Sequence, residues 1–158
     1  MSVTSVVKIS ERDSDDDGPF ESYKAELLVK DKIVATMDMI AYDHRLHQAN
    51  YEDILLNMED LSMNHAEWFA GTSAFVSRNF FYIEDIRTLR KGRGYGAELL
   101  KQVTRHFLKQ FVVIGGCLPD STLKGYSNRD NLIGFYEFQG YHFKGQCFYK
   151  QPKIGAIL

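Results

Sequence analysis

The chain of 158 residues has few cysteines, no long apolar run and almost no net charge. Its two cysteines, Cys117 and Cys147, cannot build a disulfide framework and lack metal-ligand spacing, so we expect two reduced thiols and no bound metal. No stretch reaches the ~20 consecutive apolar residues that a membrane helix needs. The first residues contain no apolar signal region and soon run into the acidic stretch at residues 13–17, which predicts a cytoplasmic protein.

The formal net charge of −2 excludes a whole-protein field that attracts nucleic acid or an anionic membrane, so neither is favoured as a partner. Any anion must therefore be bound by a local group of cations. The hydrophobic fraction of 44% is enough for one core, and 158 residues suit one domain of ordinary size. Because neither a repeat nor a linker interrupts the chain, we expect a single domain over residues 1–158.

The first half of the chain changes from strand patterns to helical patterns. Three segments have the composition or the period-2 alternation of strands: residues 3–9, 23–29 and 33–39. The last two flank the short polar turn at residues 30–32, which predicts a β-hairpin. Two helices are then expected, one capped by Asn50 with its apolar face on Ile54, Leu55, Met58 and Leu61, and one over residues 64–71.

The second half alternates strands with helices. Strands are expected at residues 79–89, 111–114 and 141–149, and helices around Leu99 to Phe107 and over residues 131–138. The central β-α-β unit requires a right-handed crossover between parallel strands. This order predicts an α/β or α+β domain with a mixed sheet and helices on both of its faces.

A glycine-rich turn separates the strand at residues 79–89 from the helix that follows. It consists of Lys91, Gly92, Arg93, Gly94, Tyr95 and Gly96. Glycine permits positive φ and close approach of a ligand, and the following helix start offers free N–H groups and a positive dipole end. Arg87 and Arg90 add to the cations of the turn. The pattern therefore predicts a binding site for a phosphate or pyrophosphate group.

Two other phosphate-binding patterns fit this turn less well. Residues 92–97 match the dinucleotide pattern G-x-G-x-x-A, and Asp120 follows the next expected strand. The preceding strand, however, carries Glu84, Asp85 and Arg87, whereas the first strand of a dinucleotide-binding fold is almost continuously apolar. Only one β-α-β unit is present. A Walker A loop is excluded because no Gly-Lys-Ser/Thr follows.

Two motifs together resemble the GNAT acetyltransferase superfamily. Residues 91–100 resemble its motif A, R/Q-x-x-G-x-G/A, and residues 131–141 resemble its motif B, which usually ends in Phe-Tyr-Glu-x-x-Gly-Phe. They occur in the family's order, separated by a strand, and span roughly residues 82–149. The resemblance implies a mixed, mostly antiparallel sheet with a central splayed pair of parallel strands and with helices on both faces. It also implies an acyltransferase that uses acetyl-CoA.

The resemblance assigns roles to residues on both sides of the splayed pair. The pyrophosphate of acetyl-CoA would contact the backbone from Gly92 to Gly96. The pantetheine arm would bind the backbone near Ile86, Arg87 and Thr88, with Asn128 or Asn131 on its other side. Tyr136 would protonate the leaving thiolate, since a tyrosine keeps its proton at neutral pH. Glu84 is our candidate for the base that deprotonates the amine; strand alternation predicts that Asp85 points to the opposite face.

The sequence departs from the family pattern in three places. Lys91 stands where the family usually has Arg or Gln, so the charge is kept but the planar fork is lost. The connection from strand to glycines looks about two residues short and lacks the common proline. The expected helix pair follows the hairpin, whereas in the family it usually follows the first strand.

Other candidate sites are weaker, and several questions stay open. Residues 13–18 begin like an EF-hand loop, but Lys24 replaces the required Glu. His44 and His47 have no partner carboxylates, and we expect both in a loop. The acceptor is predicted to be a small-molecule or peptide amine. A CoA-binding sensor or interaction domain without catalysis is the alternative to an enzyme. The oligomeric state is open, a homodimer included.

Overall fold

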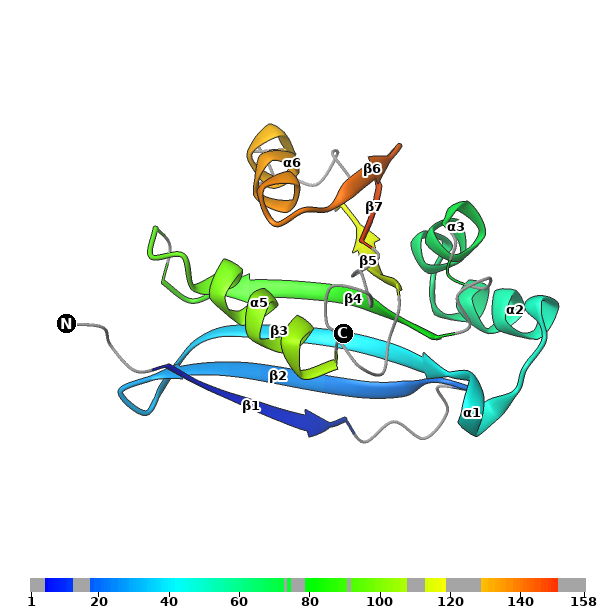
Figure 1. Ribbon diagram of the computed structural model, residues 1–158, viewed down its shortest axis with the longest axis horizontal. Coiled ribbons are helices and arrows are strands. Elements are labelled where there is room, and N and C mark those ends of the chain that lie inside the picture. The colour runs from blue at the N-terminus through cyan, green and yellow to red at the C-terminus, as the bar shows by residue number, and fades with distance from the viewer. Residues whose placement is uncertain are drawn as a thin grey trace, which may run out of the picture.

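A computed structural model describes residues 5–12, 18–72, 74, 79–90, 92–107, 113–118 and 129–150, the first three residues of the last range by their backbone alone. Seven strands form one sheet in the order β1-β2-β3-β4-β5-β7-β6 (Figure 1). The strands are β1 Ser5–Glu11, β2 Glu21–Val29, β3 Lys32–Asp43, β4 Asn79–Thr88, β5 Val113–Cys117, β6 His142–Lys144 and β7 Cys147–Lys150. The helices are α1 His44–His47, α2 Tyr51–Leu61, α3 Met63–Gly71, α5 Tyr95–Phe107 and α6 Arg129–Phe138.

The predicted hairpin is confirmed as β2 and β3. Its two turn residues, Lys30 and Asp31, have φ values of 52° and 64°. Positive φ at both central residues is the geometry of a type I′ turn, whose twist matches that of the two strands. β1 pairs with the outer edge of β2, and β4 with the outer edge of β3, all antiparallel.

Helices cover both faces of the sheet. On one face α5 packs Leu99, Leu100, Val103 and Phe107, which are at most 4% exposed, against β2, β3 and β4. These are the four residues whose spacing predicted the helix, and burying each one stabilises the fold by about 1.5–3 kcal/mol. On the other face α2 and α3 form a second core around Trp68. Figure 1 shows α2 and α3 near the start of β4 and the glycine-rich turn at the opposite end of β4.

The helix pair forms as its sequence predicts. Asn50 caps α2, accepting a hydrogen bond at 2.9 Å from the Asp53 amide. Ile54 and Met58 are buried in the second core, while Leu55 and Leu61 are half-buried against it. Ser62 ends α2 and caps α3 with its hydroxyl. The helix pair therefore follows β3 and precedes β4, as the sequence order indicated.

The central strands β4 and β5 are parallel for only four residue pairs, from Phe80 opposite Val113 to Ile83 opposite Gly116. Beyond this point β4 continues alone on that edge to Thr88, while β5 ends at Cys117. The antiparallel sheet, the splayed parallel pair and the two helical layers confirm the fold class expected from the sequence.

Two local expectations are wrong. The single strand predicted over residues 141–149 is the hairpin β6–β7, because Gly145 turns the chain with a φ of 63°. His44 to His47 form one turn of helix, α1, where a loop was expected; Asp43 caps it by accepting a hydrogen bond from the Arg45 amide at 3.0 Å. Within the described part of the chain, no helix is both long and apolar enough to cross a membrane.

Candidate active site

Glu84 lies at a β-bulge in β4. Met39 of β3 is opposite Ile83, and the next β3 residue, Asp38, is opposite Asp85, so Glu84 is the extra residue. A bulge interrupts the alternation of side chains along a strand. The prediction that Asp85 points away from the site is therefore wrong, because Glu84 and Asp85 line the same pocket.

This pocket lies where β4 and β5 separate and has a volume of about 80 Å³. Its walls come from four elements: Ile83, Glu84, Asp85 and Ile86 of β4, Cys117 of β5, Leu132 and Tyr136 of α6, and Phe148 of β7. The two residues predicted to be catalytic, Glu84 and Tyr136, are 52 positions apart in the sequence and meet here. Only the folding of α6 and β7 over the gap brings them together.

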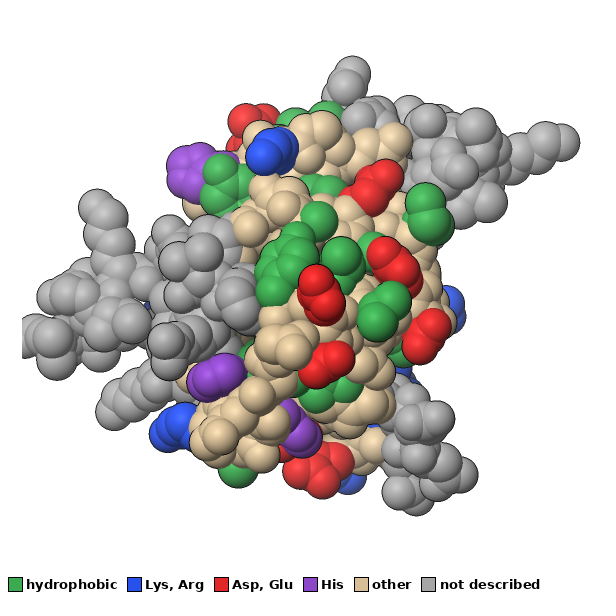
Figure 2. Space-filling model, turned by 90° about the vertical axis from the view of Figure 1, so that its right-hand side faces the viewer, with side chains coloured by type: hydrophobic (Ala, Val, Ile, Leu, Met, Phe, Trp, Pro, Cys, Tyr) green, Lys and Arg blue, Asp and Glu red, His purple; other side chains and the backbone are tan. Residues whose placement is uncertain are grey.

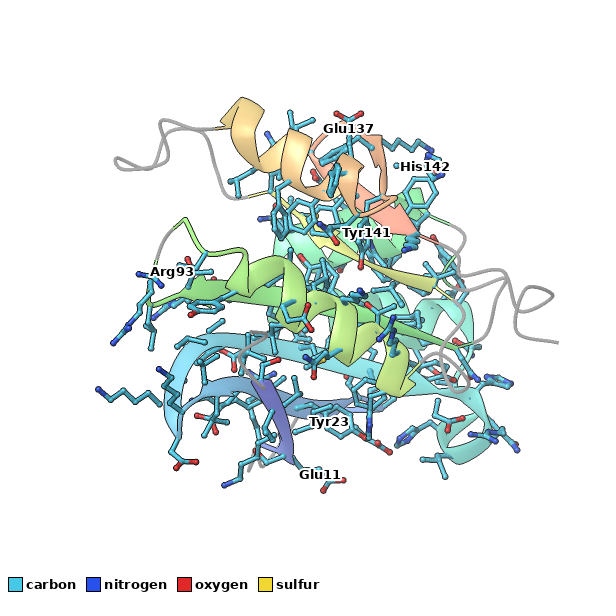
Figure 3. All side chains as sticks on the ribbon, turned by 60° about the vertical axis from the view of Figure 1, so that its left-hand side comes forward. Glu11, Tyr23, Arg93, Glu137, Tyr141 and His142 are labelled. Atoms are coloured by element: carbon cyan, nitrogen blue, oxygen red, sulfur yellow. The ribbon has the colours of Figure 1, made fainter. Side chains whose placement is uncertain are left out.

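Tyr136 is held rigidly in the wall of this pocket. It is 8% exposed, and its ring stacks on Phe148 with centroids 3.8 Å apart. Tyr141 packs edge-on against the same ring, beneath α6 (Figure 3). Burial raises the pKa of Tyr136 well above its ordinary value of 10.0, and the nearby Asp85 carboxylate raises it further. The phenol is therefore protonated at neutral pH and has a proton to donate.

Glu84 is held between two cationic or proton-donating side chains. Arg12 donates one hydrogen bond to Glu84 Oε1 and another to the Met39 carbonyl at 3.2 Å. His65 lies 3.0 Å from Glu84 Oε2 through Nε2. Burial raises the pKa of Glu84, but the hydrogen bonds from His65 and Arg12 outweigh burial and hold it below its ordinary value. Glu84 is thus an ionised carboxylate at neutral pH.

The ring of His65 is fixed by Ser62 and Tyr82. Ser62 Oγ accepts a hydrogen bond from the His65 amide at 3.1 Å and lies 2.6 Å from Nδ1. A hydroxyl donated to Nδ1 leaves the ring proton on Nε2, facing Glu84. The ring packs on Tyr82 with centroids 4.2 Å apart.

Sequence reasoning missed Arg12 and His65, which lie 72 and 19 residues from Glu84 along the chain. No local pattern marks either residue as a partner of a carboxylate on β4, since both contacts depend on how β1 and α3 pack against the sheet.

The glycine-rich turn has the geometry of an anion cradle. Gly92 and Gly94 adopt φ values of 78° and 70°, which other residues rarely adopt. The first hydrogen bond of α5 runs from the Glu98 amide to the Gly94 carbonyl. The amides of Tyr95, Gly96 and Ala97 therefore precede the helical ladder and are available to a ligand. Arg93 is exposed and extends outward from the turn (Figure 3), and Lys91 lies outside the described residues.

Ile86, Arg87 and Thr88 connect this turn to the pocket. One edge of their strand pairs with β3, from Met37 to Ala35. The other edge extends beyond the last pair with β5 and so presents backbone groups to the gap. The Arg87 side chain is exposed and ion-paired with Asp85 at 2.7 Å. Of the two predicted asparagines, Asn128 lies outside the described residues, and Asn131 is on α6 with its side chain not described.

Comparisons with known proteins identify the fold. No family model matches the sequence, and no curated protein matches it. The apo form of a mutant agmatine N-acetyltransferase is 12% identical with a TM-score of 0.50, over 82% of this chain and 74% of that one. A polyamine N-acetyltransferase from Drosophila melanogaster, which forms N-acetylagmatine, is also 12% identical, with a TM-score of 0.49 and the same coverage. With the splayed pair and the glycine turn, the first likeness shows that this chain has a GNAT-like fold, the fold of that N-acetyltransferase structure.

Proposed function

We propose that the protein is an N-acetyltransferase that transfers an acetyl group directly from acetyl-CoA to an amine. The observation that carries this proposal is the pocket where β4 and β5 separate, which is lined by both Tyr136 and Glu84. From there β4 runs to Thr88, about 13 Å at the usual rise of a strand, and ends at the anion cradle. A thioester at one end of an extended arm and a pyrophosphate at the other match this layout.

Acetyl-CoA fits the residues that are present. The pyrophosphate would be held by the backbone from Gly92 to Gly96 and by the start of α5, with Lys91 and Arg93 supplying positive charge. The free edge of β4 at Ile86, Arg87 and Thr88 would bind the amide-rich arm as a further strand binds a sheet. Asn128 and Asn131 remain the proposed contacts on the other side.

Tyr136 is proposed as the general acid. The amine nitrogen attacks the thioester carbonyl carbon, the carbon–sulfur bond breaks, and the Tyr136 hydroxyl protonates the sulfur. Burial and the Asp85 carboxylate keep the phenol protonated, so the hydroxyl still carries its proton when the thiolate develops. The stacking of Tyr136 on Phe148 orders the ring before substrate binds, so little entropy is lost in positioning it.

Glu84 is proposed as the group that receives the proton of the amine, directly or through water. Its lowered pKa makes it a weak base. A weak base suffices here, because an amine nitrogen becomes strongly acidic once it is bonded to the carbonyl carbon. Arg12 and His65 hold both carboxylate oxygens in place and so position the base for this step.

The acceptor is proposed to be a cationic amine. Residues 46–74, which contain α2 and α3, include five acidic residues and neither Lys nor Arg: Glu52, Asp53, Glu59, Asp60 and Glu67. Figure 2 views the side of the molecule where these helices lie, and acidic side chains are scattered there among apolar ones. Their field attracts cations toward the side from which His65 of α3 reaches Glu84. The agmatine named for the similar structure belongs to this class of amine.

Thermal unfolding with acetyl-CoA tests the cofactor. At 100 times its dissociation constant, acetyl-CoA should stabilise the fold by about 2.7 kcal/mol, a rise in Tm of roughly 5–10 °C. NAD(P) is the matched control and should produce no rise. A rise with NAD(P) alone would show that the site binds dinucleotides and would reject the proposal.

CoA release with a panel of amines separates an enzyme from a CoA-binding sensor. We expect release with at least one cationic acceptor, such as agmatine or a polyamine, and none with its fully acetylated form. Binding of acetyl-CoA without release for any small amine or lysine-containing peptide would favour the sensor.

A further inference from the structure

The only two cysteines of the chain lie opposite each other in the sheet. Cys117 ends β5 and is paired with Cys147, the first residue of β7. Their sulfur atoms are 3.1 Å apart. The neighbouring Leu118 amide donates to the Gln146 carbonyl at 2.9 Å, which makes Cys117 and Cys147 a non-hydrogen-bonded pair, the kind whose side chains lie closest.

One of the two thiols borders the pocket. Cys117 is half-buried and forms part of the pocket wall, whereas Cys147 is 6% exposed. The Asn64 carbonyl oxygen of α3 lies 3.3 Å from the Cys117 sulfur. The hydrogen bond between the two sulfurs lowers the pKa of Cys147 despite its burial and raises the pKa of Cys117. A small oxidant that enters the pocket therefore meets a sulfur with a second sulfur already in contact.

We propose that Cys117 and Cys147 are a reversible oxidation site at which hydrogen peroxide closes an intramolecular disulfide. One thiol reacts with the peroxide to give a sulfenic acid and water. The other thiol displaces a second water, so two S–H bonds are lost, one S–S bond forms and the peroxide is reduced to two waters.

The geometry of the strand pair allows this disulfide to close. Directly opposite residues of a non-hydrogen-bonded pair have Cα atoms about 4.5 Å apart, at the short end of the range that disulfides accept. The bond can therefore close without a large movement of either strand. The site thus suits alternation between two states.

Oxidation should also misplace the proposed general acid, Tyr136, and this consequence rests on the proposed function. Closing the bond brings the sulfurs from 3.1 Å to about 2.05 Å and so displaces Cys117 or Cys147. Cys147 is followed by Phe148, on whose ring Tyr136 stacks. Because a misplacement of about 1 Å can cost ~100-fold in rate, turnover should fall at least tenfold on oxidation and recover on reduction.

The test treats the full-length reduced protein with hydrogen peroxide and measures its intact mass and its labelling by iodoacetamide after denaturation. We expect the loss of two hydrogen atoms, no labelled cysteine, and the return of both thiols after dithiothreitol. Two free thiols, a sulfinic acid or a disulfide-linked dimer would each overturn the proposal. This measurement needs only the wild-type chain.

Cys147→Ser is the matched variant. Under peroxide this variant should keep Cys117 as a sulfenic acid that dimedone traps, and its mass should not fall by two hydrogen atoms. After dithiothreitol, its turnover should not recover with the wild-type time course. Unchanged turnover in a fully oxidised wild-type protein would overturn the link to Tyr136. The proposal that the two cysteines form a disulfide would still stand. Absence of turnover in the reduced protein would instead count against the proposed function.

Discussion

Tyr136 combines two properties that one substitution separates. The ring contributes to packing through Phe148 and Tyr141, and the hydroxyl is the proposed proton donor. Tyr136→Phe keeps the stacking, so we expect an unchanged Tm and an unchanged affinity for acetyl-CoA. The value of kcat should fall by about 10²–10⁴, the usual contribution of a general acid.

Steady-state kinetics with a saturating amine would measure this loss. Tyr149→Phe on β7 is the control, since Tyr149 is a partly buried tyrosine packed beside His142 and does not line the pocket. Equal kcat values for Tyr136→Phe and wild type would eliminate the acid role.

Glu84 connects stability to pH. Its pKa in the folded protein lies below the ordinary value of 4.5, because hydrogen bonds from His65 and Arg12 outweigh burial. The ionised carboxylate therefore stabilises the fold above that ordinary value, and this contribution is lost as the pH falls through the lower folded pKa. Glu84→Gln should cost about 1–3 kcal/mol at pH 7 and flatten the stability curve as the pH falls below the ordinary glutamate pKa of 4.5.

Urea unfolding at several pH values would measure the difference between wild type and variant. Glu59→Gln on the exposed side of α2 is the matched control and should change stability by no more than about 0.5 kcal/mol. A difference between wild type and Glu84→Gln that does not shrink at low pH would show that the ion pairs of Glu84 contribute nothing.

Strand β5 has glycine at positions 115 and 116, where other elements pack directly onto its backbone. A Cβ on Gly115 would overlap the Phe148 carbonyl oxygen and the indole nitrogen of Trp68. These two atoms form a hydrogen bond of 3.0 Å that joins α3 to β7. Gly115→Ala should therefore destabilise the protein by about 3 kcal/mol or more, through overpacking and loss of this bond.

Gly134→Ala gives the contrast within the same chain. Gly134 lies in α6, and a Cβ there meets nothing within 4 Å, so the substitution should stabilise by up to about 1 kcal/mol. Chemical denaturation of both variants would compare them. Equal stabilities for Gly115→Ala and wild type would contradict the packing of α3 and β7 on β5.

The whole molecule is nearly neutral, but its charge is unevenly distributed. The acidic α2–α3 segment should raise the local concentration of a cationic acceptor, an effect that salt screens over about 10 Å at 0.1 M. We expect the KM for such an amine to rise with ionic strength and to rise several-fold in the double variant Glu59→Gln, Glu67→Gln. The KM for acetyl-CoA in this double variant should match that of wild type.

Initial-rate measurements at low and high salt would test this steering. Glu11→Gln on β1 is the control, since Glu11 lies on the far edge strand of the sheet. If the KM for the acceptor changes neither with salt nor in the double variant, the helix pair does not recruit the amine.

The sequence alone determined the elements that follow from local physics. Alternating residues predicted the β2–β3 hairpin, helical spacing predicted α2 and α5, and the Asn50 cap located the start of α2. The glycine turn and the motif around Tyr136 were also visible, because they require particular residues at fixed spacing. Two local features were missed at this level: the turn at Gly145, which divided one predicted strand into β6 and β7, and the single helical turn α1.

Only the tertiary structure decided which groups meet at the site. The bulge at Glu84 depends on the register between β3 and β4, and it places Glu84 and Asp85 in one pocket where simple alternation separates them. The contacts of Glu84 with Arg12 and His65, and of Cys117 with Cys147, join segments that are distant in sequence. No periodicity encodes such contacts, because they arise from the packing of whole strands and helices against one sheet.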